Sequence, residues 1–178
     1  MLANSHHHGN QVGFVKVNKA TVWESSAPNS RGVTIVLVDP IRCSVEEWRT
    51  FDTYATGMNA IKLSVYLGWE VSDGSIIVGV TADEPIHNLM HALHRLRLFG
   101  VDVYDVKFHG AFAFVTQKGF PSKTVMRKTN GPDIRPYVAV SIAGKVVETL
   151  FLSLYLNFCA WCFNLPIDVE SVVAYDYA

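Results

Sequence analysis

The sequence has no excess of charge of either sign. Its 178 residues include 15 basic and 16 acidic side chains, which gives a formal net charge of −1 at pH 7. A neutral chain lacks the long-range field that attracts nucleic acid or an anionic membrane, so we expect no nucleic-acid partner. With 49% hydrophobic and 17% charged residues, the composition is that of a folded chain about one domain long and excludes disorder of the whole chain.

Cysteine is also scarce. The three residues Cys43, Cys159 and Cys162 are an odd number, so a disulfide framework within one chain does not carry the fold. Cys159 and Cys162 have the Cys-x-x-Cys spacing, but a zinc site needs four ligands and no second pair is present. A redox pair normally opens a helix after a strand, whereas this pair lies late in an apolar run. We therefore expect buried thiols or one local disulfide.

Catalytic motifs are missing. The chain contains no Gly-x-Ser-x-Gly, no His-Glu-x-x-His and no phosphate-binding glycine loop. We therefore expect a protein that is not an enzyme and binds no cofactor. Two carboxylates acting as acid and base remain an alternative, and the candidates at expected turns and strand ends are Asp39, Asp52, Asp73, Asp83 and Asp105.

The two ends of the chain differ in composition. No signal peptide is visible at the N-terminus, and residues 1–11, with His6, His7 and His8, are expected to be a disordered tail. Near the C-terminus, nineteen uncharged residues at 149–167 approach the length of a membrane span. Polar residues and a single basic flank favour a helix or strand buried against the sheet, so membrane attachment is not favoured. Residues 143–178 are expected to form an apolar extension.

Between these ends, residues 12–142 show the pattern of one α+β domain. The continuous apolar run at 33–38 predicts a central strand covered on both faces, paired as a hairpin with 45–51. Further strands or hairpin arms are expected at 12–23, 75–80, 103–108, 111–116 and 137–142, and helices at 58–70 and 85–99.

The two expected helices and the segments after them carry more detailed predictions. The first helix has Met58, Ile61, Val65 and Trp69 on one stripe. Leu63 and Leu67 lie on its other side, so this helix is expected to be mostly buried. The second is expected to start at Pro85, behind an acidic cap. His109-Gly110 predicts a two-residue hairpin turn, and residues 118–135 predict a solvated basic loop, with phosphate or acidic glycan binding as the alternative.

Three histidines on the second helix form a candidate metal site. His87, His91 and His94 have the spacing i, i+4 and i+7, which places them on one helix face. No carboxylate follows at a spacing that completes a catalytic site. A partly exposed histidine face is therefore preferred to a metal centre.

Four segments in order resemble the ILEI domain, named for the interleukin-like inducer of epithelial-mesenchymal transition. They are Arg-Gly-Val-Thr-Ile-Val-Leu at 31–37, Thr-Phe-Asp-Thr-Tyr at 50–54, Asp-Gly-Ser-Ile-Ile-Val-Gly-Val at 73–80 and Ala-Phe-Ala-Phe-Val-Thr-Gln-Lys-Gly at 111–119. The resemblance implies a β-β-α globule of twisted antiparallel or mixed sheets flanked by two helices. It also implies a secreted cytokine-like protein or a non-catalytic module of extracellular or Golgi glycan proteins.

Within that family, residues 51–54 look most like the stem domain of protein O-mannose N-acetylglucosaminyltransferase, which binds terminal N-acetylglucosamine. By this resemblance Arg31 and Asp83 take the positions of charged sugar-contacting residues. Phe108 and His109 stand where a Trp-Arg pair is expected, so an imidazole replaces a guanidinium. The cysteines of the cytokine-like branch have no counterparts around residues 114–119.

These observations lead to two expectations. The first is an extracellular, secreted or Golgi-lumenal lectin-like module that binds a glycan or glycoprotein, containing N-acetylglucosamine, through Arg31, Asp83, Phe108 and His109. The alternative is a secreted cytokine-like signalling ligand without a glycan site.

Overall fold

The described part of the chain folds into two antiparallel sheets and two α-helices. A computed structural model describes residues 2–4, 13–26, 29–130 and 137–139. The larger sheet has the strand order β5-β4-β6-β7-β8, and every neighbouring pair in it is antiparallel. Its strands are β4 (Gly32–Val38), β5 (Val45–Phe51), β6 (Ile76–Ala82), β7 (Ala111–Gln117) and β8 (Val125–Thr129).

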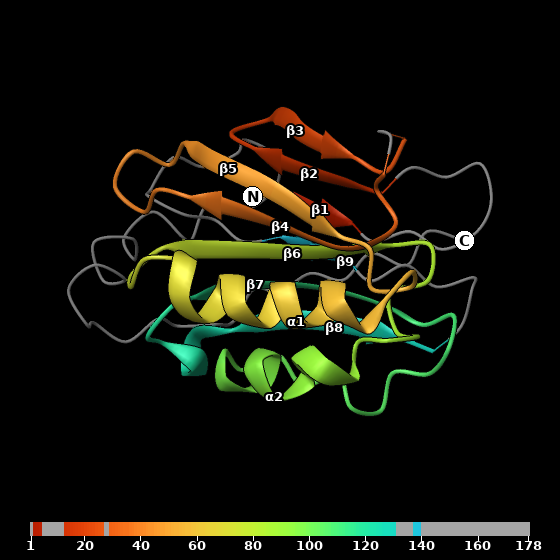
Figure 1. Cartoon of the computed structure of the whole chain (residues 1–178). Coiled ribbons are helices and arrows are strands. Elements are labelled where there is room, and N and C mark those ends of the chain that lie inside the picture. Colours follow the sequence, from red (N-terminus) through yellow and green to blue (C-terminus); the bar gives the residue numbers. More distant parts are fainter. Residues whose placement is uncertain (1, 5–12, 27–28, 131–136, 140–178) are drawn as a thin grey trace.

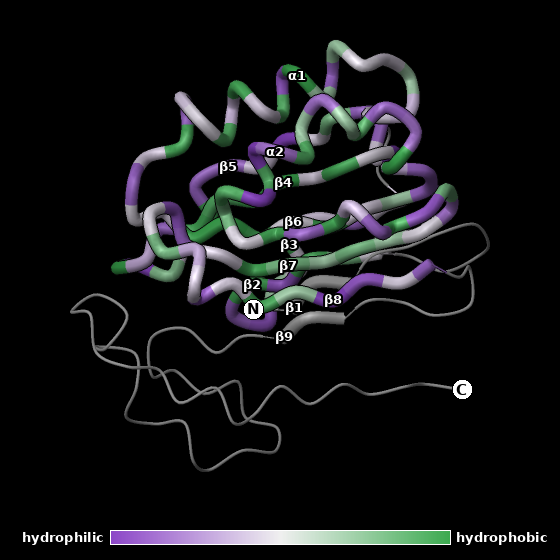
Figure 2. Tube along the Cα trace, turned by 90° about the horizontal axis from the view of Figure 1, so that it is seen from below, coloured by the Kyte–Doolittle hydropathy of each residue, from purple (hydrophilic) through white to green (hydrophobic). Residues whose placement is uncertain are grey.

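The smaller sheet has the order β3-β2-β1-β9. Its strands are β1 (Leu2–Asn4), β2 (Phe14–Val17), β3 (Ala20–Glu24) and β9 (Tyr137–Ala139). The smaller sheet packs against one face of the larger sheet, and helices α1 (Gly57–Val65) and α2 (Met90–Leu98) cover its other face. The layers therefore run in the order helices, larger sheet, smaller sheet (Figures 1 and 2). The predicted α+β class is confirmed.

The central strands are covered on both faces, as the run at 33–38 predicts. All seven residues of β4 are buried, and so are those of β6 and β7. Side chains alternate between two cores because successive residues of a strand point to opposite faces. Val33 and Ile35 face the helices, whereas Val36 and Val38 face the smaller sheet.

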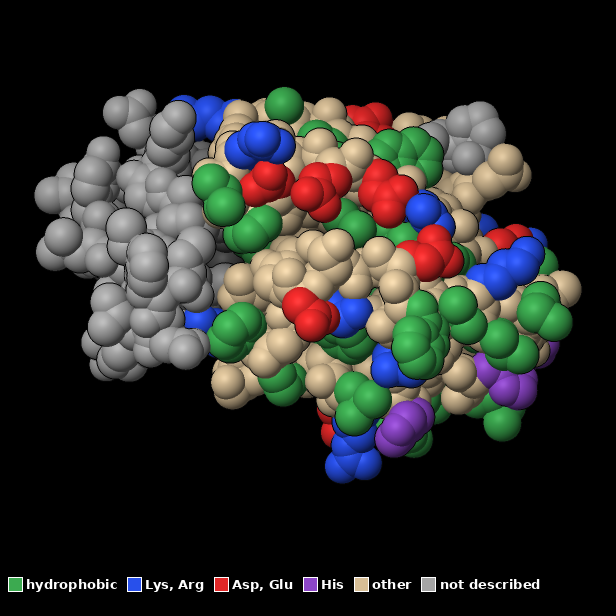
Figure 3. Space-filling model, turned by 60° about the vertical axis from the view of Figure 1, so that its left-hand side comes forward, with side chains coloured by type: hydrophobic (Ala, Val, Ile, Leu, Met, Phe, Trp, Pro, Cys, Tyr) green, Lys and Arg blue, Asp and Glu red, His purple; other side chains and the backbone are tan. Residues whose placement is uncertain are grey.

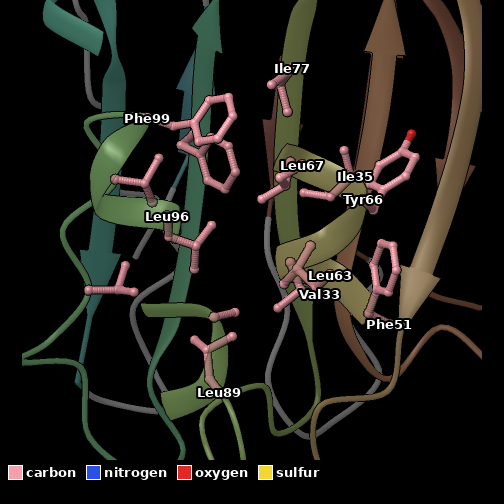
Figure 4. Packing of buried hydrophobic residues seen from close by; sticks show 14 of the residues in the cluster. Val33, Ile35, Phe51, Leu63, Tyr66, Leu67, Ile77, Leu89, Leu96 and Phe99 are labelled. Carbon is pink, nitrogen blue, oxygen red and sulfur yellow. The ribbon is translucent and has the colours of Figure 1, made fainter. Parts of the chain in front are cut away.

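The core beneath the helices is built from aromatic and branched side chains. Phe51 and Tyr66 lie against each other, with ring centroids 5.5 Å apart, while leucines from both helices fill the space over the sheet (Figure 4). The second core lies between the sheets and includes Val15, Val17 and Trp23. The predicted hairpin of 33–38 with 45–51 is confirmed by the pairing of β4 with β5.

The first helix is buried on one side and exposed on the other. It continues from α1 into a π-helical turn, η1 (Tyr66–Glu70). Ala60 and Leu63 are buried against the sheet, while the predicted stripe faces outward. Trp69 is 81% exposed, and Met58, Ile61 and Val65 are also exposed. The prediction that this helix is mostly buried was wrong for the stripe, because only the side with Ala60 and Leu63 packs into the core over the sheet.

The second helix starts later than predicted. Residues 86–89 form turns and α2 begins at Met90. The carbonyl of Pro85 accepts a hydrogen bond from the Thr53 hydroxyl, and Glu84 accepts one from the backbone N–H of Ile86. Of these groups, only the Pro85 carbonyl would take part in the hydrogen bonds of a helix beginning there, and here it accepts from Thr53.

Two predictions about the following segments were wrong. Residues 103–108 form no strand, and β7 pairs with β6 and β8 instead. Val103 and Val106 enter the core from a loop, so these apolar residues are buried without strand pairing. The basic segment 118–135 includes a 3-10 turn, η2 (Pro121–Lys123), and strand β8, and so is a loop only in part.

The predicted tail also differs at Leu2–Asn4, since these residues pair with β2 and β9. His6, His7, His8, the apolar segment 149–167 and the pair Cys159 and Cys162 lie outside the described residues. Cys43 is buried at the turn between β4 and β5.

Candidate functional site

Four segments far apart in the sequence meet at one end of the larger sheet. Strands β4 and β7 begin where β5 and β6 end, because each neighbouring pair is antiparallel. Arg31 therefore lies beside the segment after β5 and the loop after β6, with residues 108–109 next to that loop. This end is on the right in Figure 1.

Arg31 and Asp52 form the central polar contact of this end. Arg31 Nε donates to Asp52 Oδ1 at 3.0 Å and Nη2 donates to Oδ2 at 2.7 Å, a bidentate arrangement. The guanidinium also lies over the Tyr54 ring, 4.6 Å from its centroid. These contacts fix the plane of the guanidinium while leaving 39% of the Arg31 side chain exposed.

The pair shifts the pKa of both partners. Burial acts to raise the pKa of Asp52, but hydrogen bonds from Arg31 and from the backbone N–H of Ala55 outweigh it and lower the pKa overall. The hydrogen bond to Asp52 raises the pKa of Arg31. Both side chains are therefore charged at neutral pH.

A shallow hollow of about 370 Å³ lies next to this pair. Arg31 and Asp83 both line it, and the charge of Asp83 acts on Arg31 across it. Asp83 has a positive φ of 56°, a conformation that Asp and Asn adopt more readily than most residues. The complete lining is Ser25, Asn29, Ser30, Arg31, Asp52, Ala82 and Asp83.

Beyond Arg31, aromatic side chains form a continuous row, which we call the ring row: Tyr54, His87, Phe108 and His109. The centroid distances are 5.2 Å from Tyr54 to His87, 6.3 Å from His87 to Phe108 and 4.0 Å from Phe108 to His109. Phe108 is 51% exposed and Tyr54 and His87 are also exposed. The row therefore presents ring surface to solvent.

Glu84 anchors the far end of the ring row. Its carboxylate is buried and accepts hydrogen bonds from the backbone N–H groups of Ile86, at 2.7 Å, and His109, at 2.5 Å. His109 Nδ1 lies 3.3 Å from Glu84 Oε2, the oxygen that also accepts the His109 backbone N–H. The two side chains form an ion pair when the imidazole is protonated. Glu84 thus joins the loop after β6 to the turn before β7.

Thr53 and Asn88 join the segment after β5 to the loop after β6. The buried Thr53 hydroxyl donates to the carbonyl of Pro85 at 2.6 Å, and the Thr53 carbonyl accepts from the N–H of Asn88. Asn88 Nδ2 also donates to the carbonyl of Tyr54 at 2.8 Å. The site is therefore built on loops fixed by hydrogen bonds to one another.

The structure places all four predicted site residues at this end, in two groups. Arg31 and Asp83 share the hollow, and Phe108 and His109 lie in contact in the ring row with their planes tilted by 59°. Asp52, Tyr54, Glu84 and His87 were not predicted as parts of this site. Asp52 and Tyr54 stand in one of the quoted family segments, but nothing in the sequence shows that they meet Arg31.

The other candidate sites have different outcomes. Among the described residues, no three His, Cys, Asp or Glu side chains come together so that they could hold a metal ion. His87 belongs to the ring row, whereas His91 packs against Gly57 of α1. Of the candidate aspartates, Asp52 and Asp83 share the hollow, but the pKa of Asp52 is lowered, whereas a general acid at neutral pH needs a raised one.

Fold and site together define a small α+β module with a polar hollow and exposed rings at one end of an antiparallel sheet. The family model described as Interleukin-like EMT inducer (ILEI) matches residues 31–120, about half of the chain. The chain belongs to the ILEI family. This family is extracellular or secreted, has the character of an interaction or cytokine-like module and is not a known catalytic family.

Two further findings accompany this assignment. No curated protein matches the chain. Over the part of the chain that the structure describes, none of the helices combines the length and the apolar character needed to span a membrane.

Proposed function

We propose that this chain is a non-catalytic carbohydrate-binding module of the ILEI type that works outside the cell or in the Golgi lumen. The observation that carries the proposal is the position of the charged hollow directly beside the ring row at one end of the sheet. The ligand is a glycan or glycoprotein that contains N-acetylglucosamine.

The polar part of the site suits sugar hydroxyl groups. A pyranose presents neighbouring hydroxyls that both donate and accept hydrogen bonds. Asp83 supplies acceptors at the hollow, and Arg31 supplies donors from a guanidinium whose plane is already fixed by Asp52. Preorganised charged groups make the stronger hydrogen bonds and lose little side-chain entropy on binding.

The ring row suits the apolar side of a sugar. One face of a pyranose carries C–H groups, and the N-acetyl group adds a methyl. Phe108 is half exposed and rests on the rings of His87 and His109, so it offers a supported flat surface for such groups. A site with a few oriented polar groups next to aromatic surface has the composition of a small-molecule site.

The test is a glycan array followed by calorimetric titration of the full chain with an N-acetylglucosamine-terminated oligosaccharide. We expect saturable binding that Arg31→Ala and Asp83→Asn each weaken about tenfold, as loss of one charge-assisted hydrogen bond does. Asn is chosen at residue 83 because it tolerates the positive φ found there.

Matched controls separate the site from general effects of charge and exposure. Arg42→Ala removes an exposed arginine at the other end of β4, and Tyr104→Ala removes an exposed aromatic residue outside the ring row. Both should bind like wild type, while Phe108→Ala should bind more weakly. Absence of saccharide binding by the wild type, or equal binding by all variants, contradicts the proposal.

A second candidate function, a secreted cytokine-like ligand without a glycan site, is favoured by the outer face of the first helix. Met58, Ile61, Val65 and Trp69 are exposed along this face, and Trp69 is 81% exposed. Hydrophobic and charged side chains lie interspersed on this side of the molecule (Figure 3). Exposed apolar surface of this kind is typical of protein interfaces, where Trp is enriched among the dominant contacts.

Cell-surface binding distinguishes the two candidates. The cytokine-like function predicts saturable binding to a surface protein that free N-acetylglucosamine does not compete with and that Trp69→Ser abolishes. The carbohydrate-binding function predicts competition by the free saccharide and no effect of Trp69→Ser.

A further inference from the structure

A second hollow lies at the opposite end of the larger sheet. This end of the sheet is on the left in Figure 1 and comes forward in Figure 3. The volume of the hollow is about 440 Å³, within the usual range of small-molecule sites. It opens where α2 ends, β6 begins and β7 ends. The lining residues are Asp73, Gly74, Arg95, Leu98, Phe99, Gln117, Lys118, Gly119, Phe120 and Pro121.

Arg95 brings a guanidinium to this hollow that no described residue neutralises. Its Nε atom is buried and has no hydrogen-bond partner among the described residues, and no described carboxylate forms an ion pair with it. A partly buried guanidinium without an anion leaves strong donors unused. An anionic ligand group would satisfy them.

The position of Arg95 depends on a glycine. A Cβ atom added at Gly68, in η1, would lie only 2.8 Å from Arg95 Cζ and 2.9 Å from Nη2. The guanidinium therefore rests on the backbone at residue 68, a place that any side chain there would occupy. Arg95 is consequently held at the hollow by close packing.

Gln117 adds an acceptor with a defined orientation. The residue is only 4% exposed, and its Nε2 donates to the carbonyl of Gly74 at 2.9 Å. Because Nε2 must face that carbonyl, Oε1 is the atom left over, and it is buried without a partner among the described residues. A ligand that donates a hydrogen bond to Oε1 would relieve an unpaired buried acceptor.

Lys118 and Asp73 are the other charged residues that line this hollow, and their charges limit the kind of ligand it can bind. Lys118 Nζ donates to the carbonyls of Gly68 and Val71, at 3.0 and 2.7 Å, and lies 3.5 Å from the exposed carboxylate of Asp73. Two cations against one acidic side chain leave the hollow positive. The donor that meets Gln117 should therefore be a neutral N–H or O–H and not an ammonium group.

We propose that this hollow is a binding site for a small carboxylic acid that carries a neutral hydrogen-bond donor next to its carboxylate and an apolar chain. The carboxylate pairs with Arg95, the donor meets Gln117 Oε1 and the chain lies on Leu98, Phe120 and Pro121. N-acylated amino acids have all three groups. The site is independent of the carbohydrate site, because the two hollows share no lining residue.

The first test uses the full wild-type chain and three probes in a calorimetric or NMR titration. N-acetyl-L-leucine carries all three groups, N-acetyl-L-leucinamide lacks the charge, and 4-methylpentanoate lacks the donor. We expect N-acetyl-L-leucine to bind at least tenfold more tightly than either of the others. Equal binding of the acid and its amide, or of the acid and inorganic sulfate, overturns the proposal.

The second test compares variants that separate position from charge. Gly68→Ala keeps every charge but displaces the Arg95 guanidinium, and Arg95→Gln removes it; each should weaken N-acetyl-L-leucine about tenfold. Arg97→Gln, two residues along on α2 and exposed toward Tyr104, should have no effect. If Gly68→Ala binds N-acetyl-L-leucine like wild type and Arg97→Gln binds it more weakly, affinity follows the net charge of the protein. That result contradicts a site built around Arg95.

Discussion

Arg31 and Asp52, 21 residues apart in the sequence, meet through two parallel hydrogen bonds of 3.0 and 2.7 Å at one end of the larger sheet. The pair joins the start of β4 to the end of β5 and fixes the guanidinium over the ring of Tyr54. It therefore contributes to stability and at the same time orients a donor group at the candidate site.

The first prediction concerns the stability that this pair contributes. Arg31→Ala should lower the free energy of unfolding at pH 7 by about 1 kcal/mol, the upper end for a partly exposed ion pair. Urea denaturation measures the change. The matched control, Arg42→Ala, removes a longer contact of 3.6 Å to Asp39 by a side chain that is 81% exposed, and should change stability little.

The same pair predicts an acid dependence. The pKa of Asp52 is lowered in the folded state, so the pair's contribution is fully present above the unfolded value of about 3.9 and is lost as the pH falls through the lower folded value. The stability difference between wild type and Arg31→Ala should therefore be constant from pH 7 to about 5 and shrink below pH 4. A difference that grows on acidification would show that the carboxylate is not stabilised by Arg31.

Tyr66 predicts an alkaline dependence. Its hydroxyl donates to Glu47 Oε1 at 2.9 Å, and burial together with this carboxylate raises its pKa. Stability from the neutral phenol is complete below the unfolded pKa of about 10 and is lost as the pH rises through the higher folded value. Wild type should lose stability above pH 10 more steeply than Tyr66→Phe, as thermal unfolding across that pH range measures. Parallel curves for the two proteins would contradict this.

We expect any side chain at Gly79, in the central strand β6, to destabilise the fold through overpacking. Gly79 pairs with Phe114 across β6 and β7, and a Cβ atom at residue 79 would lie 2.0 Å from the phenylalanine ring. Gly79→Ala should therefore destabilise the fold by about 3 kcal/mol through overpacking. Combining it with Phe114→Leu should recover part of that loss in a double-mutant cycle, whereas strictly additive effects would mean that the ring does not cover the glycine.

We expect the Thr53 hydroxyl to affect both the stability of the fold and the affinity for saccharide. This buried hydroxyl holds the carbonyl of Pro85 in the loop that carries Asp83 and Glu84. Thr53→Val should cost about 1–2 kcal/mol and should also weaken saccharide binding. Thr50→Val is the control, because Thr50 bonds Thr34 within the sheet, away from that loop. Unchanged saccharide affinity in Thr53→Val would show that the loop does not depend on this bond.

The strands were predictable from sequence where burial and pattern agree. The run at 33–38 has no polar alternation and forms a strand covered on both faces. The buried side of the first helix could not be predicted from the sequence pattern, because this helix has apolar residues on two sides. Which side is buried depends on how the helix packs against the sheet. Val103 and Val106 belong to a segment predicted as a strand, but they enter the core from a loop.

The candidate site was predictable only in part. Arg31, Asp83, Phe108 and His109 were named from a resemblance, and the structure places them at one end of the sheet. Asp52 and Tyr54 could not be assigned to the site, since their contact with Arg31 depends on the register of β4 and β5. The same holds for Arg95, whose position depends on the missing side chain at Gly68.

The central claim is that the Arg31 end of the sheet binds a saccharide, and backbone NMR of the labelled chain titrated with an N-acetylglucosamine-terminated oligosaccharide tests it most directly. The account predicts saturable shifts at Arg31, Tyr54, Asp83 and His109 that fit one dissociation constant. Gly74 and Gly119, at the opposite end, should not move. Shifts confined to that opposite end, or no saturable shift with the saccharide, would contradict it.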